Sequence, residues 1–283
     1  MIFFNESIEI SDSTFILIRD LIHSKTGIFF NNDKKELLAE KLSSRVFDNG
    51  FTNFTDYYFK LKYEESENEW KELLNCITVN ETYFWREFDH IKLIVNNLIP
   101  DFFENHKKSS LRIWSAACST GEEPLTLAMA INEAGYFDKY PIHIYASDAS
   151  SNAIQRAKSG FFKERSFRNI PVEIKEKYFV QDNFQWKINP QIHNKVEWYV
   201  KNLKDFNEFS FLNFSEIILC RNVFIYFSDD AIKDIVNNFY DKMPNPSYLF
   251  IGISESLLKL KTKFELIEKD NTFLYIKNER KKL

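Results

Sequence analysis

Six small residues in succession, from Ala116 to Gly121, follow the apolar run LRIWS and precede two acids, Glu122 and Glu123. A backbone without bulk lets a ligand approach closely. A strand, such a loop and a helix N-terminus form the place where α/β proteins hold nucleotide-like ligands. A phosphate site would carry Lys or Arg at this point. The two carboxylates instead favour a ligand with cationic groups, and S-adenosylmethionine, with an ammonium and a sulfonium, is such a ligand.

A third acid, Asp148, ends the apolar run IHIYAS. An Asp at the carboxyl end of the second strand of a nucleotide-binding sheet can accept hydrogen bonds from both ribose hydroxyls of an adenosine. The alternative is that Asp148 caps the helix predicted for the following segment, SSNAIQRAK. Because the 116–121 loop precedes Asp148 by about a helix and a turn, we favour the ribose-binding interpretation.

The run IILCRNVFIYF, residues 217–227, carries Arg221 and Asn222 inside a β-rich sequence. Unpaired polar groups within a buried strand are costly. We therefore predict that the strand ends at Cys220 and leaves Arg221 and Asn222 at its ligand-facing tip. Tyr226 then lies one turn further on and faces the pocket. In the alternative, Arg221 is a buried ion-pair partner and Tyr226 is a packed aromatic residue.

The segment NETYFWR, residues 80–86, places Asn80, Thr82 and Arg86 among three aromatic residues. These polar side chains could bind a carboxylate while the aromatic rings cover an adenine or anchor the loop. The alternative is a solvated helix end with aromatic residues that anchor it in the core.

The residues before this segment predict a helical region. Apolar residues recur at steps of three and four from Phe15 to Ile22, which is typical of one helix face, and Gly27 is expected to end that helix. Asp33 followed by Glu36 has the spacing of a capping box and predicts the start of the next helix. Further helices are expected at residues 54–61 and 70–77.

Beyond residue 111, strand-like runs alternate with helical stretches, which predicts a doubly wound parallel sheet with helices on both faces. The boundary between the two regions is expected near residues 100–110. Residues 161–198 fit the alternation poorly and could form an inserted subdomain or an irregular loop over the active site. The expected strands are at residues 111–114, 142–147, 196–200, 216–220, 247–253 and 273–277.

Composition narrows the class of protein. The 283 residues are enough for two domains, and a net charge of −4 gives no global basic field for nucleic acid or membrane. Three scattered cysteines form neither a disulfide framework nor a metal cluster, which indicates a reducing, intracellular setting. The sequence shows no signal peptide and no run of about 20 apolar residues, so we expect a cytoplasmic protein without a bound metal.

Several segments, taken in order, resemble those of the CheR family, the chemotaxis-receptor methyltransferases. NETYFWRE is similar to the family's N-E-T-x-F-x-R motif, and IWSAACSTGEEPLTLAM to its small-residue loop followed by S-T-G-E-E-P. IYASDASSNAIQRAKSGFF is similar to its second strand and following helix. LCRNVFIYF and IGISESL are similar to C-R-N-V-x-I-Y-F and G-x-S-E-S. The resemblance covers nearly the whole chain and depends on the combination of these segments.

The resemblance implies an α/β fold in two domains. A small all-α N-terminal domain at residues 1–100 precedes a doubly wound, Rossmann-like class I S-adenosylmethionine-dependent methyltransferase domain at residues 101–283. The family also carries a small antiparallel β-subdomain, whose counterpart here is residues 161–200. This stretch is short and lacks the glycine-rich turns of tight hairpins. We therefore expect a reduced subdomain and do not extend receptor-tether binding to this chain.

The resemblance also implies roles for single residues. Positions that match the family's cofactor site are Asn80, Thr82 and Arg86 near the methionyl part, Ala116 and Glu122 in the loop, Asp148 at the ribose, Asn202 and Leu203 beside the adenine, and Arg221 and Asn222 at the polar tip. The candidate catalytic residues are Arg86 and Tyr226. Tyr226 matches the tyrosine proposed to face the acceptor, whereas Arg86 either steers the acceptor or holds only the carboxylate of the cofactor.

The implied activity is that of a protein-glutamate O-methyltransferase, which gives glutamyl methyl esters on membrane chemotaxis receptors and S-adenosylhomocysteine as the product of the cofactor. We expect a monomer that acts on the receptor's cytoplasmic helical domain, without nucleic acid and without direct membrane insertion. Lys34, Lys41 and Arg45 fall in one stripe of the second helix at ~100° per residue. This stripe either contacts an acidic receptor surface or is a solvated face.

Two other functions stay open at this point. A regulatory module would bind S-adenosylmethionine without transferring its methyl group. A methyltransferase that acts on nucleic acids or small molecules fits less well, because the charge balance is acidic and the N-P-P-[YF]-type segment of amino-methylating enzymes is absent.

Overall fold

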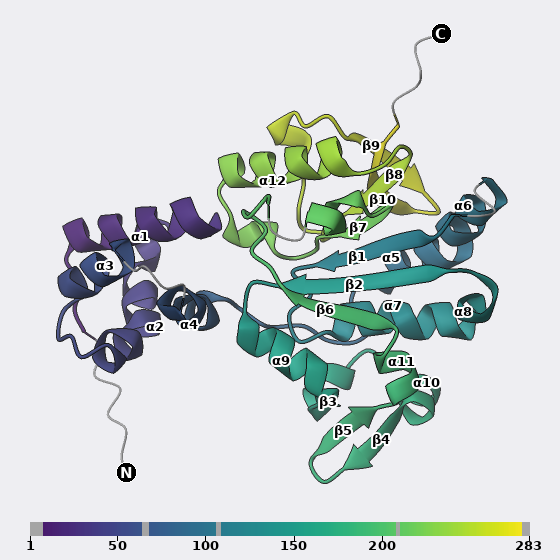
Figure 1. The fold of residues 1–283 in the computed structure, drawn as a ribbon, viewed down its shortest axis with the longest axis horizontal. Helices are drawn as coiled ribbons and strands as arrows, with labels where there is room; N and C mark the ends of the chain where they lie inside the picture. Colours follow the sequence, from purple (N-terminus) through teal and green to yellow (C-terminus); the bar gives the residue numbers. More distant parts are fainter. Residues whose placement is uncertain (1–7, 64–67, 106–108, 208–209, 279–283) are drawn as a thin grey trace.

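The computed structural model describes residues 8–63, 68–105, 109–207 and 210–278, and Figure 1 shows a helical region beside a larger α/β region. Apolar side chains between Ile10 and Ile77 form the hydrophobic cluster of the helical region. None of the helices in the described ranges is long and apolar enough to cross a membrane. The helices of this region are α1 (Asp12–Thr26), the 3₁₀ helix η1 (Asn32–Lys34), α2 (Lys35–Asp48), α3 (Phe54–Lys62) and α4 (Asn68–Ile77).

The ends of the first two helices follow the local sequence in different ways. The Ser11 side chain caps α1, and Gly27 ends it with a φ of 79°, as predicted. The capping box predicted at Asp33 and Glu36 is wrong, because α2 begins at Lys35 without a side-chain cap. The 3₁₀ turn of η1 leads directly into α2 and satisfies its first backbone N–H, so no cap is required there.

A buried ion pair joins α2, α3 and α4. Arg45 donates from Nε and Nη2 to the carboxylate of Glu69 at 3.1 and 2.5 Å, and the hydroxyl of Tyr57 donates to the same carboxylate at 2.7 Å. Burial alone would raise the pKa of Glu69, but the hydrogen bonds from Arg45 and Tyr57 lower it below its usual value. These contacts make the carboxylate a structural centre of the helical region.

Replacing Arg45 by Gln should destabilise the protein, because the charge of Glu69 then stays buried without its partner. We expect the free energy of unfolding to fall by about 3 kcal/mol, measured by denaturant unfolding. The exposed Lys71→Gln, which removes the same charge, is the control. Because the pKa of Glu69 is lowered, this contribution is present at neutral pH and is lost as the pH falls below the ordinary glutamate value of about 4.3. Equal unfolding midpoints for Arg45→Gln and the wild type would contradict this role.

A seven-stranded sheet forms the centre of the α/β region. Its order is β6-β2-β1-β7-β8-β10-β9, and the strands from β6 to β8 run parallel. The strand order reverses at β1, whose neighbours are β2 and β7, so a crevice is expected at the carboxyl ends of these strands. The strands are β1 (Leu111–Ala116), β2 (Ile142–Asp148), β6 (Val196–Val200), β7 (Ile217–Leu219), β8 (Ser247–Phe250), β9 (Glu265–Lys269) and β10 (Thr272–Lys277).

The far edge of the sheet departs from the predicted parallel arrangement. β10 runs antiparallel to both β8 and β9, and β9 has no counterpart among the predicted strands. β9 is a mostly exposed edge strand with the sequence ELIEK, so it lacks the apolar run of a buried strand. Asp270 and Asn271, both at positive φ, form the tight turn that makes this hairpin possible.

Helices cover both faces of the sheet, as predicted. Alternate residues of β1 belong to different cores: Ile113 joins the cluster that contains α7, and Trp114 joins the cluster that contains α12. Figure 1 shows α12 on one side of the sheet and α7 and α9 on the other. The helices are α5 (Phe88–Leu93), the π-helical η2 (Ile94–Leu98), α6 (Ile99–Asn105), α7 (Glu122–Glu133), α8 (Tyr136–Lys139), α9 (Ser151–Ser159), η4 (Ser210–Phe214), η5 (Phe224–Tyr226), α12 (Asp229–Lys242) and η6 (Leu258–Leu260).

The hydrophobic clusters divide the chain earlier than expected. The cluster of the helical region ends at Ile77, whereas Phe84 and the apolar residues of α5, η2 and α6 through Phe103 belong to a cluster of the large sheet. Residues 84–103 are therefore part of the α/β region by packing. The structure favours a boundary between Ile77 and Phe84 over the predicted boundary at residue 100.

A three-stranded antiparallel sheet of order β3-β5-β4 lies between β2 and β6 in the chain. Its core joins Phe162 and Phe179 to Phe84 by edge-to-face contacts. The β4–β5 turn forms without glycine because Asn183 adopts a left-handed φ of 53°. Strand β6, although within residues 161–200, belongs to the large sheet. The elements are β3 (Phe161–Phe162), η3 (Glu164–Phe167), α10 (Val172–Tyr178), β4 (Phe179–Asp182), β5 (Gln185–Ile188) and α11 (Pro190–His193).

Candidate active site

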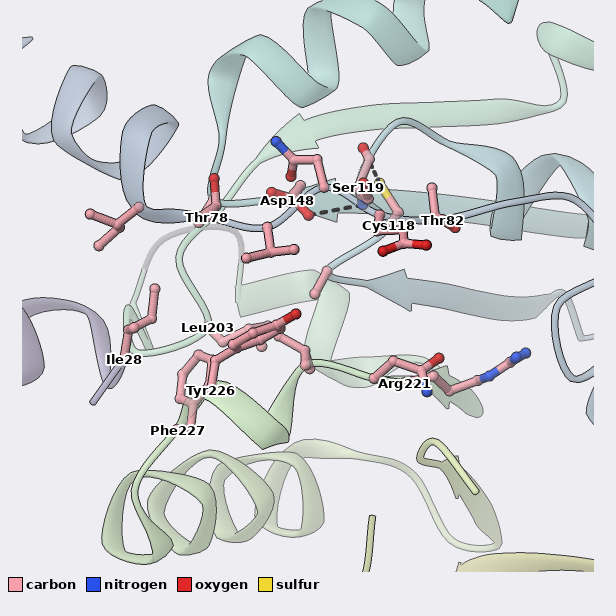
Figure 2. A pocket seen from close by; sticks show the side chains of 18 of the residues that line it. Ile28, Thr78, Thr82, Cys118, Ser119, Asp148, Leu203, Arg221, Tyr226 and Phe227 are labelled. Carbon is pink, nitrogen blue, oxygen red and sulfur yellow. Dashed lines mark hydrogen bonds between the residues drawn. The ribbon is translucent and has the colours of Figure 1, made fainter. Parts of the chain in front are cut away.

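A cavity lies at the carboxyl ends of β1, β2 and β7, between the large sheet and the helical region, as Figure 2 shows. Residues 117–119, 201–203 and 221–227 contribute to one side of its wall, and residues 26–41 contribute to the other. It therefore gathers segments that are far apart in the sequence. The predicted site residues that line it are Lys34, Lys41, Asn80, Thr82, Arg86, Asp148, Asn202, Leu203, Arg221, Asn222 and Tyr226.

The small-residue loop lines the cavity through Ala117, Cys118 and Ser119, and not through the predicted Ala116. Ala116 still pairs with Ser147 in the sheet and is fully buried, so the loop begins one residue later. Ala117 and Ser119 have left-handed backbone angles, with φ of 60° and 51°. Such angles are strained for residues with a Cβ and cluster at functional sites.

Glu122 and Glu123 face different surfaces, because neighbours on a helix are ~100° apart. Glu123 lines the cavity, and its Oε1 accepts a hydrogen bond from the hydroxyl of Ser115 at 2.6 Å. Glu122 lines an adjacent groove, and its carboxylate accepts from the hydroxyls of Thr120 and Ser166 at 2.7 and 2.9 Å. Burial raises the pKa of both carboxyl groups. The loop acid on the cavity side is therefore Glu123 and not the predicted Glu122.

Asp148 joins the loop to the start of α9. Its Oδ2 accepts from the N–H of Ser119 and its Oδ1 from the N–H of Ser150, both at 2.8 Å. The cap of α9 is the hydroxyl of Ser150, which accepts from the N–H of Ala153, so Asp148 does not have the alternative capping role. Burial raises the pKa of Asp148, and the backbone hydrogen bonds oppose this rise. Asp148 is thus a buried carboxylate held in place on the cavity wall.

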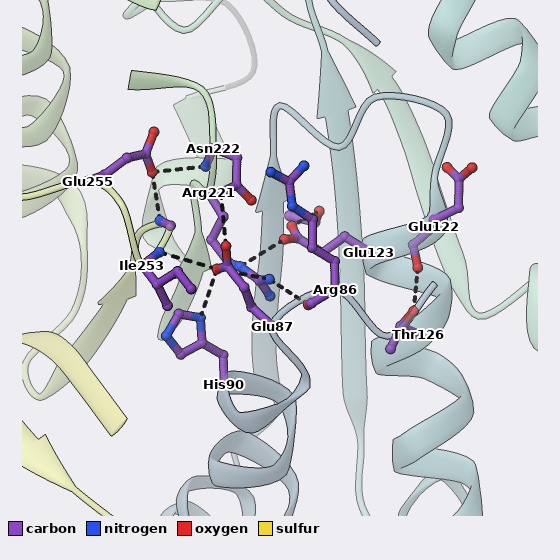
Figure 3. A network of polar contacts seen from close by, with 12 residues as sticks. Arg86, Glu87, His90, Glu122, Glu123, Thr126, Arg221, Asn222, Ile253 and Glu255 are labelled. Carbon is purple, nitrogen blue, oxygen red and sulfur yellow. Dashed lines mark hydrogen bonds and ion pairs between the residues drawn. The ribbon is translucent and has the colours of Figure 1, made fainter. Parts of the chain in front are cut away.

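A buried ion network lies beside the cavity and shares Arg221 and Glu123 with its wall; Figure 3 shows the contacts of this network. Nη2 of Arg221 lies 3.3 Å from Oε2 of Glu87 and donates to the carbonyl of Arg86 at 2.6 Å, while its Nε lies 3.4 Å from Oε2 of Glu123. The Arg221 side chain therefore has the ion-pairing role of the alternative interpretation, although the residue also lines the cavity. His90 beside Glu87 is neutral at neutral pH, because burial lowers its pKa to about 4.

Arg86 reaches the cavity from a sharply turned segment. Its neighbours Trp85 and Glu87 both have positive φ, 65° and 48°. Arg86 donates to the carbonyl of Glu81 at 3.2 Å, and within the described ranges no carboxylate lies at ion-pair distance from its guanidinium. Burial raises the pKa of Tyr226, and the positive charge of Arg86 opposes this rise. The phenol of Tyr226 therefore keeps its proton at neutral pH.

The helical region is bonded to the cavity wall beside Tyr226. The N–H of Phe29 donates to the carbonyl of Tyr226 at 2.9 Å, and the side-chain amide of Asn202 donates to the carbonyl of Lys25 at 2.8 Å. Asn202 thus contributes to the contact between the two regions. Its predicted place beside an adenine stays a prediction.

Asn75, near the end of α4, makes a second contact between the regions. Its Oδ1 accepts from the hydroxyl of Ser150 at 2.9 Å and from the N–H of Asn152 at 3.1 Å, at the start of α9 and close to Asp148. The sequence analysis does not identify Asn75, because a single Asn in an amphipathic helix usually faces solvent and belongs to no motif here. Only the arrangement of the two regions reveals its position.

The predicted basic stripe on α2 divides in the structure. Lys34 and Lys41 line the cavity, where Lys41 donates to the carbonyl of Cys76 at 3.2 Å. Arg45 does not line the cavity, because its ion pair with Glu69 holds it in the core of the helical region. In the part of the chain that the structure describes, no group of three or more His, Cys, Asp or Glu side chains is placed to hold a metal ion.

Glu255 supports the cavity without lining it. Its Oε2 accepts from the backbone N–H groups of Asn222 and Gly252 at 2.9 and 2.6 Å, and its Oε1 accepts from that of Phe224 at 2.7 Å. These bonds hold Asn222 at a left-handed φ of 57° and fix the start of η5, which ends in Tyr226. The segment IGISESL contains this residue, but its sequence does not show which backbone groups the carboxylate binds.

Replacing Glu255 by Gln should loosen this loop, because one acceptor oxygen becomes an NH₂ donor that faces a backbone N–H. We expect local stability to fall by about 2 kcal/mol, which corresponds to roughly thirtyfold faster hydrogen exchange at the amides of Asn222 and Phe224. The exposed Glu265→Gln in β9 is the matched control. If exchange at these two amides stayed at the wild-type rate, the loop would not depend on Glu255.

The chain matches both parts of one family. The family described as "CheR methyltransferase, SAM binding domain" matches residues 80–273, and "CheR methyltransferase, all-alpha domain" matches residues 13–78. Chemotaxis protein methyltransferase 2 of Vibrio cholerae serotype O1 is 32% identical over 261 residues, which cover 92% of this chain and 91% of that protein. The chemotaxis protein methyltransferase of Borreliella burgdorferi is 35% identical over 263 residues, with coverages of 90% and 92%. These matches confirm the resemblance in sequence, and the chain belongs to the CheR methyltransferase family.

Proposed function

We propose that this chain transfers the methyl group of S-adenosylmethionine to glutamate side chains of chemotaxis receptors. The products are glutamyl methyl esters and S-adenosylhomocysteine. The observation that carries the proposal is the cavity, in which the loop held by Asp148 meets Arg86 and Tyr226 from two other segments. Membership of the CheR methyltransferase family and the relatives named chemotaxis protein methyltransferases support this substrate class.

The chemistry of the cavity wall fits this cofactor. The buried carboxylate of Asp148 suits ribose hydroxyls, and Glu123, which pairs with Arg221, adds a second carboxyl group to the cavity wall. The 116–121 loop has no Lys or Arg for a phosphate. We propose that the cofactor contacts are Asp148 at the ribose, Asn202 and Leu203 beside the adenine, and Asn80, Thr82 and Arg86 at the methionyl part.

The reaction needs little acid–base catalysis from the protein. Bound S-adenosylmethionine supplies an electrophilic methyl group, and an acceptor glutamate with a pKa of about 4.3 is already ionised at neutral pH. We propose that the chain contributes orientation and exclusion of water. Tyr226 keeps its proton and can donate a hydrogen bond to the acceptor side. Close pairing with Arg86 would make the acceptor carboxylate less nucleophilic, so we propose that Arg86 holds the carboxylate of the cofactor.

We propose that the partner is the cytoplasmic helical domain of membrane chemotaxis receptors and that the enzyme works as a cytoplasmic monomer. The relatives' names support a chemotaxis protein as the substrate. Lys34 and Lys41 lie on the helical side of the cavity, so we propose that they meet carboxylates of the receptor around the target glutamate. Charges that complement those of a partner mainly affect the association rate and its salt dependence.

Methyl labelling tests this function directly. Receptor cytoplasmic fragments from the same source should become labelled when they are incubated with the protein and methyl-labelled S-adenosylmethionine. Mass mapping should place the label on glutamate as an ester that alkali removes. Fragments with the mapped glutamates replaced by alanine are the control. Binding of S-adenosylmethionine by calorimetry, with no labelling of competent fragments, would instead favour the regulatory module.

Two substitutions should separate cofactor binding from methyl transfer. Asp148→Ala removes the buried carboxylate, so the calorimetric Kd for S-adenosylmethionine should rise by about tenfold or more. Tyr226→Phe removes only the phenol oxygen and should leave Kd unchanged while kcat falls by about tenfold. Tyr248→Phe, a half-buried tyrosine of β8 outside the cavity, is the control. An unchanged kcat in Tyr226→Phe would contradict the proposed role of Tyr226 in methyl transfer.

A further inference from the structure

A second, open groove lies beside the cavity, and residues 79–82 form the wall between the two. We call these residues the strap. The other side of the groove comes from the end of α9 and from residues 161–168, which lead from β3 through η3. Figure 1 shows α9 and β3 on the side of the large sheet away from α12. The groove therefore borders the same strap that carries Asn80 and Thr82 into the cavity.

Basic side chains dominate the groove. Arg168 is already engaged, because its Nη2 lies 3.4 Å from Oε1 of Glu81 and its guanidinium lies 3.7 Å from the centre of the Tyr83 ring. The other three basic residues are exposed, and within the described ranges none of them has an ion pair. The basic residues that line the groove are Arg156, Lys163, Arg165 and Arg168.

Within the described ranges, the acids near the groove form no ion pair with the three exposed basic residues. Glu164 lies between Lys163 and Arg165 in the chain, but its carboxylate accepts hydrogen bonds from Lys175 and from the Trp186 indole, both at 2.7 Å. It is therefore directed away from the groove and does not line it. Glu122 lines the groove as a buried residue: two hydroxyl groups donate to its oxygens, and the positive charge of Arg165 opposes the rise of its pKa. The exposed wall of the groove thus carries three basic side chains that form no ion pair within the described ranges.

We propose that this groove binds an acidic segment of the protein substrate, next to the glutamate that receives the methyl group. The inference rests on the proposed function, which requires the acceptor carboxylate to enter the cavity on the other side of the strap. The chain as a whole has a net charge of −4, so the groove is a local field of the opposite sign. Such a field attracts carboxylates and raises the association rate.

The groove lacks a feature of many phosphate sites, because α9 does not direct its N-terminus toward it. Arg156 and Ser159 lie in the last turn of α9, so the helix presents its C-terminal end to the groove. That end carries the negative pole of the helix and lacks the free N–H groups that bind phosphate at an N-terminus. The positive charge of the groove comes from side chains alone, which fits a flexible acidic peptide.

The test removes the three exposed positive charges together, as Arg156→Gln, Lys163→Gln and Arg165→Gln in one variant. The KM for a receptor cytoplasmic fragment should rise by about tenfold, and KM should depend less steeply on salt concentration than in the wild type. The calorimetric Kd for S-adenosylmethionine should stay unchanged, because none of the three residues lines the cavity. Wild-type KM and salt dependence in this variant would overturn the inference.

The control variant removes the same charge far from the groove, as Lys233→Gln, Lys242→Gln and Lys259→Gln, which are exposed on α12 and on η6. This control variant should keep the wild-type KM. If its KM rose as much as that of the groove variant, the effect would come from net charge alone, and the inference would be overturned.

If the wild type labels no receptor fragment, the proposed function fails separately. The groove is then tested with a fluorescent oligoglutamate peptide. Equal binding by the wild type and the groove variant, or tighter binding of an oligonucleotide, would overturn the inference.

Discussion

The candidate site depends on the burial of one positive charge. The guanidinium of Arg221 lies between the carboxylates of Glu87 and Glu123 and also donates to the carbonyl of Arg86. A buried charge is tolerated only when partners surround it, so these contacts fix the segment before α5, the start of α7 and the tip of β7 relative to one another. Arg221 binds both the carbonyl of Arg86 and the carboxylate of Glu87, as Figure 3 shows. These contacts fix the backbone from which the side chain of Arg86 reaches the cavity.

The sequence predicts those parts of the fold that depend on a local pattern of residue types. The central strands are apolar runs buried on both faces, the loop after β1 consists of small residues, and Gly27 ends α1 with a positive φ. The sequence does not predict strands whose side chains are only partly buried. The exposed edge strand β9 has no apolar run, and the short strands of the small sheet are joined by an Asn183 turn that carries no glycine signal. In both places tertiary contacts outweigh local propensity.

The sequence predicts most of the segments that line the candidate cavity, but not the directions of their side chains. The choice between Glu122 and Glu123 depends on how α7 is rotated against the sheet, and adjacent sequence positions do not encode this rotation. Arg45 lies one turn after the cavity lysine Lys41 in α2, yet its carboxylate partner comes from another helix. Asn75 accepts from a backbone N–H 77 positions away and Glu255 from one 33 positions away, so no spacing rule reveals them. The family resemblance indicates where the cavity lies. The hydrogen-bond and ion-pair partners of these residues follow only from how the elements pack.

The contacts between Tyr226 and the helical region make the cavity wall a joint product of both regions. The N–H of Phe29 binds the carbonyl of Tyr226, and Gly27 packs so closely that a Cβ there would lie 2.7 Å from the Phe227 ring. Two anchors therefore hold η5: the carboxylate of Glu255 at its start and the helical region at its end. The position of Tyr226 in the cavity wall depends on residues 27–29 of the other region as well as on its own segment.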